Sequence, residues 1–188
     1  MDLDDVLPNA HHVTRQSRWV DAPPDVVWDA LHEVKLSGLP VTVALSAARF
    51  LPVVLSGKGL GHLHDRPFLD ALPVPLLVSE EPESVVFGGA LQAWRLRGGE
   101  KAPELDAEGL QRWNQPGWVK AVMDFRLTPS RGGTELSSET RVLATDPTTR
   151  SRFSWYWLVV RPGSTAIRWE VLTAVQVRAE ARARALAA

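Results

Sequence analysis

Apolar and polar residues alternate most regularly between positions 119 and 144. Apolar side chains occupy every second position over residues 119–127, and the same period returns over residues 134–144, where apolar residues share these positions with serine and threonine. A period of two is typical of a β-strand with one apolar face. Turn-forming residues separate the two runs, so the pattern predicts a hairpin with a two-residue loop at Arg131-Gly132. Such a loop would pair Phe125 with Ser138 and gather the apolar side chains on one face, and a register shifted by two residues would keep the same face.

The N-terminal third of the chain is predicted to form a strand followed by two helices. Residues 13–20 have the mixed polarity of a strand, and the sequence DAPPD follows them. Prolines and acids favour the first turn of a helix, and apolar residues then recur at helical spacing from Val26 to Val34. A second, more apolar helix is predicted over residues 41–55.

Three short strands and a short helix are predicted in the middle of the chain. The strand segments are residues 76–79, 84–88 and 91–97. We expect Gly88-Gly89 to mark a bulge or a sharp bend, because glycine weakens a regular strand. A short helix over residues 106–113 begins with an aspartate that can cap its first turn.

The C-terminal part is predicted to be helical. Asp146 and Pro147 are typical of a helix start, as cap and first residue. Pro162-Gly163 is expected to break or kink the helix, because proline has no backbone N–H. After it, an apolar stripe from Ile167 to Ala179 follows the helical period.

Composition limits the class of protein. The chain has 188 residues, 45% hydrophobic and 23% charged, which fits one globular domain over residues 1–188. Lysine and arginine number 21 against 22 aspartates and glutamates, so we expect no nucleic-acid partner. The absence of cysteine excludes disulfides and cysteine-based sites. An acidic N-terminus without an apolar segment predicts no secretory signal, and hence a cytoplasmic protein.

The longest apolar stretch, residues 38–56, is long enough to cross a bilayer. Arg49 lies inside it and Pro40 and Pro52 interrupt it. A charged residue within a membrane span costs roughly 3 kcal/mol. We therefore expect no stable membrane span but a buried or partner-covered helix, which could also form a homodimer.

Two histidines in a glycine-rich segment could carry metal chemistry. His62 and His64 would share a face of an extended segment and could hold a metal ion with Asp65 or Asp70. A loop with two ordinary histidines explains the same residues, and no second histidine motif supports a site. We expect neither a metal nor a cofactor.

Two carboxylates of the hairpin could act as an acid–base pair. Asp124 and Glu139 would lie opposite or diagonal to each other on its polar face. With Arg126 and Arg141 beside them, a solvated pattern of cross-strand charges is the preferred interpretation. His11-His12 lies near a terminus that is expected to fray.

Hydroxyl groups are the polar side chains that the alternation places on the apolar face of the hairpin. Ser138 and Thr140 could orient a carbonyl or hydroxyl of a ligand, although a bond to nearby backbone is commoner. Arg15 shares strand parity with Trp19, so it reaches the same side if Trp19 points inward. The alternative is an arginine that extends to the rim.

Four segments carry a family resemblance: WVDAPPDVVWDAL, SEEPESVVFGG, NQPGWVKAVMDFRLTP and GTELSSETRVLATDPTTRSRFSWYW. They resemble an uncharacterised bacterial branch of the START/polyketide-cyclase (SRPBCC) superfamily, over about residues 12–182. None is a catalytic motif, so they indicate fold rather than reaction. The resemblance implies an α+β helix-grip fold, in which a curved antiparallel β-sheet wraps around a long C-terminal α-helix, with two short helices after the first strand.

The resemblance also implies an apolar tunnel between sheet and helix. Members of the superfamily bind sterols, lipids, plant hormones, quinones or polyketides, and some cyclise or dehydrate polyketides. We expect a carrier or sensor that binds a hydrophobic small molecule or lipid, because the apolar face has no well-placed acid, base or nucleophile. The alternative is a polyketide cyclase/dehydratase-like enzyme that uses a polar residue of the same cavity, such as Arg15, Tyr156 or a loop histidine. The residues expected to line the cavity are Arg15, Trp19, Phe87, Ala121, Met123, Phe125, Ser138, Thr140, Ile167, Val171 and Val175.

Overall fold

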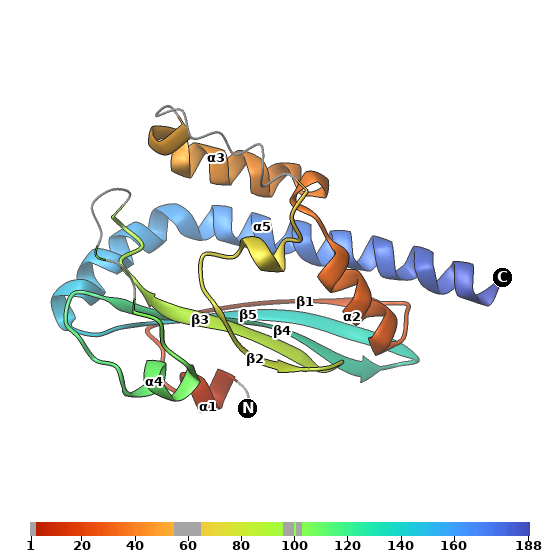
Figure 1. The fold of residues 1–188 in the computed structure, drawn as a ribbon, viewed down its shortest axis with the longest axis horizontal. Helices are drawn as coiled ribbons and strands as arrows, with labels where there is room; N and C mark the ends of the chain where they lie inside the picture. Colours follow the sequence, from red (N-terminus) through yellow and green to blue (C-terminus); the bar gives the residue numbers. More distant parts are fainter. Residues whose placement is uncertain (1–2, 55–64, 96–99, 101–102) are drawn as a thin grey trace. The chain divides into compact units, whose positions relative to one another are not determined.

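The computed structural model describes residues 3–54, 65–95, 100 and 103–188, with the backbone alone over residues 48–54. Its elements follow one another along the chain as Figure 1 shows. They are α1 (Leu3–Val6), β1 (His12–Val20), α2 (Pro24–Glu33), the 3-10 helix η1 (Leu36–Gly38), α3 (Pro40–Val54), the 3-10 helix η3 (Leu69–Ala71), β2 (Leu76–Glu80), β3 (Ser84–Leu91), α4 (Ala107–Arg112), β4 (Val119–Ser130), β5 (Gly133–Ala144) and α5 (Pro147–Ala187).

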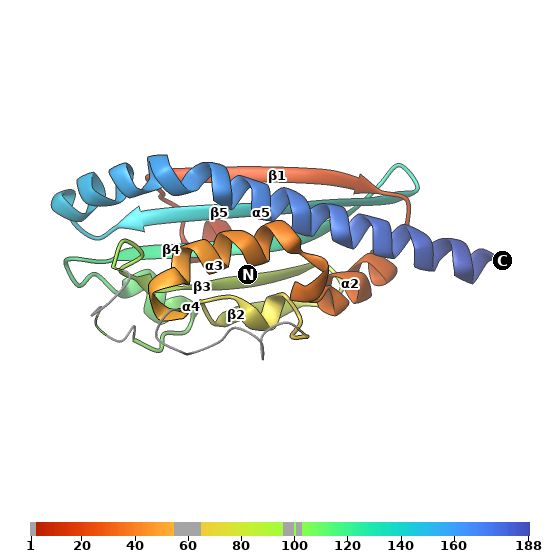
Figure 2. The same cartoon turned by 90° about the horizontal axis from the view of Figure 1, so that it is seen from above.

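The five strands form one antiparallel sheet in the order β1-β5-β4-β3-β2 (Figure 2). Two helices, α2 and α3, follow the first strand, and the long helix α5 follows the last one. This is an α+β fold, as predicted, and its element order is consistent with the helix-grip fold.

The hairpin of β4 and β5 confirms the predicted two-residue loop. β4 ends at Ser130 and β5 begins at Gly133. Arg131 and Gly132 have φ angles of 51° and 81°. Positive φ at both central residues suits the twist of a tight hairpin, which explains the glycine in the second position.

Helix α5 runs without a break from Pro147 to Ala187, so a break at Pro162-Gly163 is wrong, and the alternative of a kink there stays a prediction. A proline removes a single helical hydrogen bond, and the turns on both sides keep theirs. The predicted start is confirmed, because the Asp146 carboxylate accepts a hydrogen bond from the Thr149 N–H at 2.9 Å. Among the residues that the structure describes, no helix is long and apolar enough to cross a membrane.

Strand β3 passes through Gly88 without a bulge on its β4 side, where the pairing is regular from Ser84 to Leu91. A side chain at Gly88 would bring a Cβ atom within 2.8 Å of Leu77 Cδ1, so the glycine allows close packing rather than a bend. The irregular pairing lies instead between β2 and β3.

The strand predicted over residues 91–97 is also wrong at residues 92–95, which form a turn.

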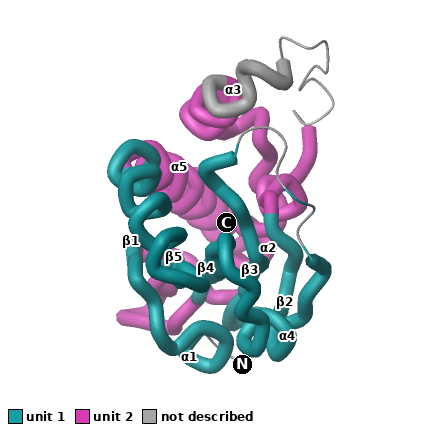
Figure 3. The backbone as a smooth tube through the Cα atoms, turned by 90° about the vertical axis from the view of Figure 1, so that its left-hand side faces the viewer, with its two compact units in different colours: residues 1–16, 74–126, 137–161 teal, residues 17–73, 127–136, 162–188 magenta. Residues whose placement is uncertain are grey.

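The chain divides into two compact units, teal and magenta in Figure 3. Unit 1 contains residues 1–16, 74–126 and 137–161, and unit 2 contains residues 17–73, 127–136 and 162–188. Each unit is built from three separate stretches of chain, so no single boundary in the sequence separates them. The prediction of one domain over residues 1–188 stays a prediction.

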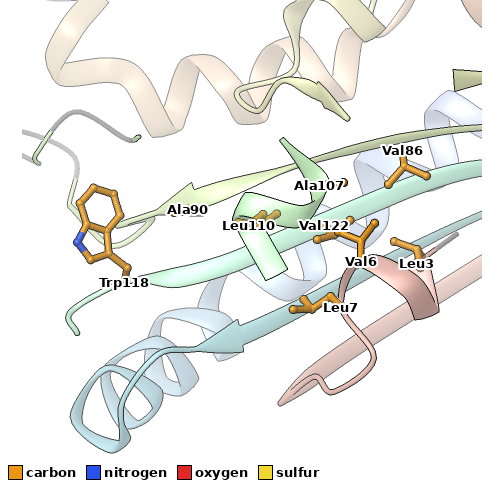
Figure 4. Packing of buried hydrophobic residues seen from close by; sticks show 9 residues of the cluster. All are labelled: Leu3, Val6, Leu7, Val86, Ala90, Ala107, Leu110, Trp118 and Val122. Atoms are coloured by element: carbon orange, nitrogen blue, oxygen red, sulfur yellow. The ribbon is translucent and has the colours of Figure 1, made fainter. Parts of the chain in front are cut away.

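In unit 1, the short helices α1 and α4 pack on one face of β3 and β4 (Figure 4). The buried residues of this cluster are Leu3, Val6, Leu7, Val86, Ala90, Ala107, Leu110, Trp118 and Val122. Asp106 caps α4 as predicted, accepting a hydrogen bond from the Gly109 N–H. The cluster covers the side of the hairpin that the alternation assigned to solvent.

In unit 2, helix α2 buries its predicted apolar stripe from Val26 to Val34. Helix α3 lacks an acidic residue in its first turn. The Glu170 carboxylate of α5 supplies that charge, since it accepts hydrogen bonds from the Val41 N–H, the Thr42 N–H and the Thr42 hydroxyl at 2.6–2.7 Å. A carboxylate at a helix N-terminus satisfies free N–H groups and interacts favourably with the helix dipole.

Candidate functional site

Strand β4 presents two different faces within unit 1. We call the inner face the one that carries Ala121, because Ala121 packs against a cluster containing Phe153 of α5. We call the outer face the one that carries Val122, which packs under α1 and α4. Since side chains alternate along a strand, the inner face of β4 also holds Met123 and Phe125.

The strand pairing brings six of the predicted site residues together on the inner face. Phe87 of β3 lies opposite Met123, and Gly89 lies opposite Ala121. The two-residue hairpin loop pairs Phe125 with Ser138 across β4 and β5. Counting along the same pairing sets Thr140 beside Met123. The assembled residues are Phe87, Ala121, Met123, Phe125, Ser138 and Thr140.

The six residues differ in burial. Phe87, Phe125 and Ser138 are buried, whereas Ala121, Met123 and Thr140 are half-buried. The half-buried residues carry two apolar side chains and one hydroxyl. This part of the inner face therefore keeps accessible apolar surface next to a polar group.

The Ser138 hydroxyl is a buried polar group of the inner face. Its oxygen is fully buried and has no hydrogen-bond partner among the residues that the structure describes. The buried hydroxyl of Thr134, on the same strand, donates to the Ala22 carbonyl oxygen at 2.7 Å. An unsatisfied buried hydroxyl is uncommon in proteins and calls for an explanation.

His12 is an inner-face residue that the sequence interpretation missed. Its ring contacts Phe153 and Trp157 of α5, with centroids 5.4 and 5.9 Å apart, and His12 is the first residue of β1. His12 Nε2 lies 3.3 Å from the Ser154 hydroxyl. Burial, followed by the positive charges of neighbouring groups such as Arg150, lowers the pKa of His12 below its usual 6.5. The imidazole is therefore neutral near pH 7.

Arg15 and Trp19 lie on the exposed side of β1, not inward as the parity argument expected. Arg15 acts electrostatically on Asp124, an outer-face residue. The Trp19 indole N–H donates to the Ser130 carbonyl oxygen at 3.2 Å. The half-buried residues of β1 are the alternate ones, beginning with His12.

The remaining expected lining residues belong to α5 in unit 2. Val171 and Val175 are fully buried, and Ile167 is half-buried. All three lie on the predicted apolar stripe of the helix, and their contribution to a ligand site stays a prediction.

Asp124 is buried on the outer face, which overturns the solvated charge pattern expected for it. Desolvation raises its pKa from 3.8 to about 6, although a hydrogen bond from the Glu139 N–H and the Arg126 guanidinium act in the opposite direction. Glu139 itself pairs with Arg141 at 2.6 Å. These carboxylates have structural partners away from the inner face, and they do not form an acid–base pair at the candidate site.

The histidine segment with His62 and His64 lies outside the described residues. Asp65 and Asp70 are described and exposed. Where the structure describes the chain, no group of three or more histidine, aspartate or glutamate side chains could hold a metal ion.

No family model matches the sequence, and no curated protein matches it. Solved structures that resemble it include protein MLL2253 from Mesorhizobium loti, with 14% identity and a TM-score of 0.40 over 87% of this chain and 96% of that one. CalU16 from Micromonospora echinospora is 16% identical, with a TM-score of 0.29 over 93% and 85% of the two chains. Ara h 8.0201 is 10% identical, with a TM-score of 0.28 over 87% and 97%. Membership of the START/polyketide-cyclase superfamily stays a prediction.

Proposed function

We propose that the inner face binds a hydrophobic small molecule or a lipid, as a carrier or sensor. The observation that carries this proposal is the buried Ser138 hydroxyl without a partner among the described residues. Leaving a buried polar group unsatisfied costs about 1–3 kcal/mol. A ligand carbonyl or hydroxyl that bonds to Ser138 would offset this cost, and that gain favours the ligand-bound state.

The surroundings of Ser138 favour an apolar ligand with one polar group. Phe125 lies opposite Ser138, and Phe87 and Met123 form the next row of the sheet. Small residues follow in the row after that, where Gly89 lies opposite Ala121. Ligand sites are commonly apolar surfaces with a few fixed polar groups, and this face has that composition.

Native mass spectrometry against a library of lipids and aromatic compounds tests the proposal. We expect the wild-type protein to retain a ligand, and Ser138→Ala to weaken its retention about tenfold, as expected for one lost hydrogen bond. Ala121→Leu should block binding because it adds volume to the inner face. Met123→Leu is the matched control, since it keeps the volume nearly constant. Retention of no compound, or equal retention by Ala121→Leu, would overturn the proposal.

A polyketide cyclase/dehydratase-like enzyme is the second candidate, and His12 is the observation that favours it. Its imidazole is neutral near pH 7 and lies on the inner face beside Ser154. A neutral histidine there can accept a proton from an activated carbon of a bound polyketide. Incubation with a linear poly-β-ketone thioester tests this role, and mass spectrometry detects the loss of water that follows formation of the new C–C bond in the ring. Product that disappears in His12→Ala and persists in His11→Ala supports it, and an unchanged substrate contradicts it.

Two expectations about the whole protein also stay proposals. The first is a cytoplasmic location, which fractionation of cells expressing the tagged protein tests. The second is a homodimer formed through α3, the predicted apolar helix. Light scattering after size-exclusion chromatography gives the mass in solution, and a mass of 20.7 kDa would exclude the dimer.

A further inference from the structure

The N-terminal part of α5 carries a patch of exposed apolar side chains. Trp155, Leu158 and Val159 are 73%, 64% and 79% exposed. Leu158 and Val159 follow Trp155 by three and four residues, which is about one helical turn, so the three side chains lie on one side of the helix. The other side of the same turns carries Phe153, which is buried against the inner face. We call Trp155, Leu158 and Val159 the α5 patch.

Exposed arginines flank the α5 patch. Arg152 lies one turn before Trp155, and Arg161 lies one turn after Leu158. The sequence contains no aspartate or glutamate from Pro147 to Trp169. The patch is therefore apolar in the centre and cationic at both ends.

We propose that the α5 patch docks on the surface of an anionic lipid bilayer. Helices that lie in a membrane interface combine a tryptophan and aliphatic residues with basic side chains, which is the arrangement on α5. Arginine favours an anionic surface over a neutral one, and the absence of acidic residues along the segment removes repulsion from such a surface. The docking is peripheral, and it does not depend on the ligand proposed for the inner face.

Sedimentation with lipid vesicles tests the docking. The probes are vesicles of phosphatidylcholine alone and vesicles of equal parts phosphatidylcholine and phosphatidylglycerol. We expect binding to the anionic vesicles to be about tenfold stronger or more, and to weaken as salt is added, because salt screens the attraction of the arginines. Equal binding to both vesicles, or no binding to either, would overturn the proposal.

Substitutions within and outside the α5 patch show whether vesicle binding depends on the patch or on the helix in general. The double variant Leu158→Glu/Val159→Glu should lose about tenfold or more in vesicle binding, because it adds negative charge to the contact. Val177→Glu is the control, because Val177 is 61% exposed on the C-terminal part of α5 and lies outside the patch. This variant should bind vesicles as the wild type does. Arg152→Ala/Arg161→Ala should lose the preference for anionic vesicles. Circular dichroism and thermal melting check that each variant folds.

The competing occupant of the patch is a second copy of the chain. If light scattering shows a dimer that Leu158→Glu/Val159→Glu dissociates, while the vesicles bind no protein, the membrane proposal is wrong. Ser138→Ala distinguishes this proposal from the proposed function. It should weaken ligand retention and leave vesicle binding unchanged, so either proposal can fail alone.

Discussion

The two faces of β4 in unit 1 bury polar groups in different ways. On the outer face, the Lys120 ammonium donates to the Gln111 carbonyl oxygen, and Asp124 accepts the Glu139 N–H. Arg141 pairs there with Glu139 and Asp4, each at 2.6 Å. On the inner face, the Ser138 hydroxyl has no partner in the part of the chain that the structure describes.

The charged groups of the outer face therefore stabilise the fold through partners in the chain, whereas the Ser138 hydroxyl is available to a ligand. Charges are costly to bury, so each of the outer-face charges named above is matched by a partner of the same chain. A lone hydroxyl costs less, and a protein can keep one unsatisfied where function requires it. The comparison predicts that outer-face substitutions change stability, whereas inner-face substitutions change binding.

The largest expected effect comes from Arg141→Leu. Removing the guanidinium leaves the Glu139 carboxylate mostly buried without its partner, and it releases Asp4 of α1. Breaking a buried ion pair costs about 3 kcal/mol or more. Urea denaturation gives the free energy of unfolding. A loss below about 1 kcal/mol would mean that the outer-face ion pairs do not hold α1 on the sheet.

Asp124→Asn should change the pH dependence of stability. Burial raises the pKa of Asp124 from 3.8 to about 6, so the folded state binds this proton more tightly than the unfolded state. The stability from this group is present below the ordinary pKa and is lost as the pH rises through about 6. We expect the variant to exceed the wild type by up to about 3 kcal/mol near pH 8 and to match it near pH 4.

Urea denaturation of both proteins across this pH range is the measurement for Asp124. The side-chain oxygen of the introduced asparagine can still accept a hydrogen bond from the Glu139 N–H, so wild type and variant both keep this bond and differ in the titration of the carboxyl group. A constant difference between the two proteins at all pH values would contradict the titration of a buried carboxyl.

Two hydroxyl deletions test whether satisfied and unsatisfied groups differ. Thr134→Val removes a hydroxyl that donates to the Ala22 carbonyl oxygen, and it should cost about 1 kcal/mol. Ser138→Ala removes a hydroxyl without such a partner, and it should leave the stability of the ligand-free protein equal or slightly higher. Thermal and urea unfolding of the two variants measure this. An equal loss in both would show that Ser138 is satisfied in solution, by water for example.

The smallest effect is expected for Arg112→Ala. Arg112 and Glu108 form an exposed ion pair one turn apart in α4, at 3.3 Å. Such pairs contribute less than about 0.5 kcal/mol, because water and salt screen the charges. The variant is therefore the reference for Arg141→Leu in urea denaturation. A loss as large as that of Arg141→Leu would mean that burial is not what distinguishes the two arginines.

The sequence was sufficient for the elements with strong local signals. The alternation in β4 and β5 identified both strands and the loop at Arg131-Gly132, and Asp106 and Asp146 marked the starts of α4 and α5. In each case neighbouring residues alone determine the structure. A loop of two residues pairs Phe125 with Ser138, so the five hairpin residues of the candidate site could be assigned to one face before the structure.

The covering of the outer face could not be predicted in the same way. Helix α1 has four residues, which is too short for a helical period to be recognised. Helix α4 was expected from its cap at Asp106, but no local pattern places it on the face of the sheet. Without these helices, Asp124 is one more charged residue on a polar strand face. Its burial follows from contacts between segments distant in the sequence, and no local pattern contains that information.

The orientation of β1 was missed for a different reason. Its two faces have similar polarity, so the alternation does not say which face is covered. The sequence argument counted Arg15 and Trp19 as lining residues on the condition that Trp19 points inward. In the structure Trp19 is exposed, and His12 is on the inner side.

The contact between Glu170 and the first turn of α3 means that one side chain anchors this end of a helix of fifteen residues. Replacing Glu170 would remove these three hydrogen bonds from the first turn of α3. One substitution at position 170 can therefore weaken the hydrogen bonding of this end of α3 without touching a residue of β4.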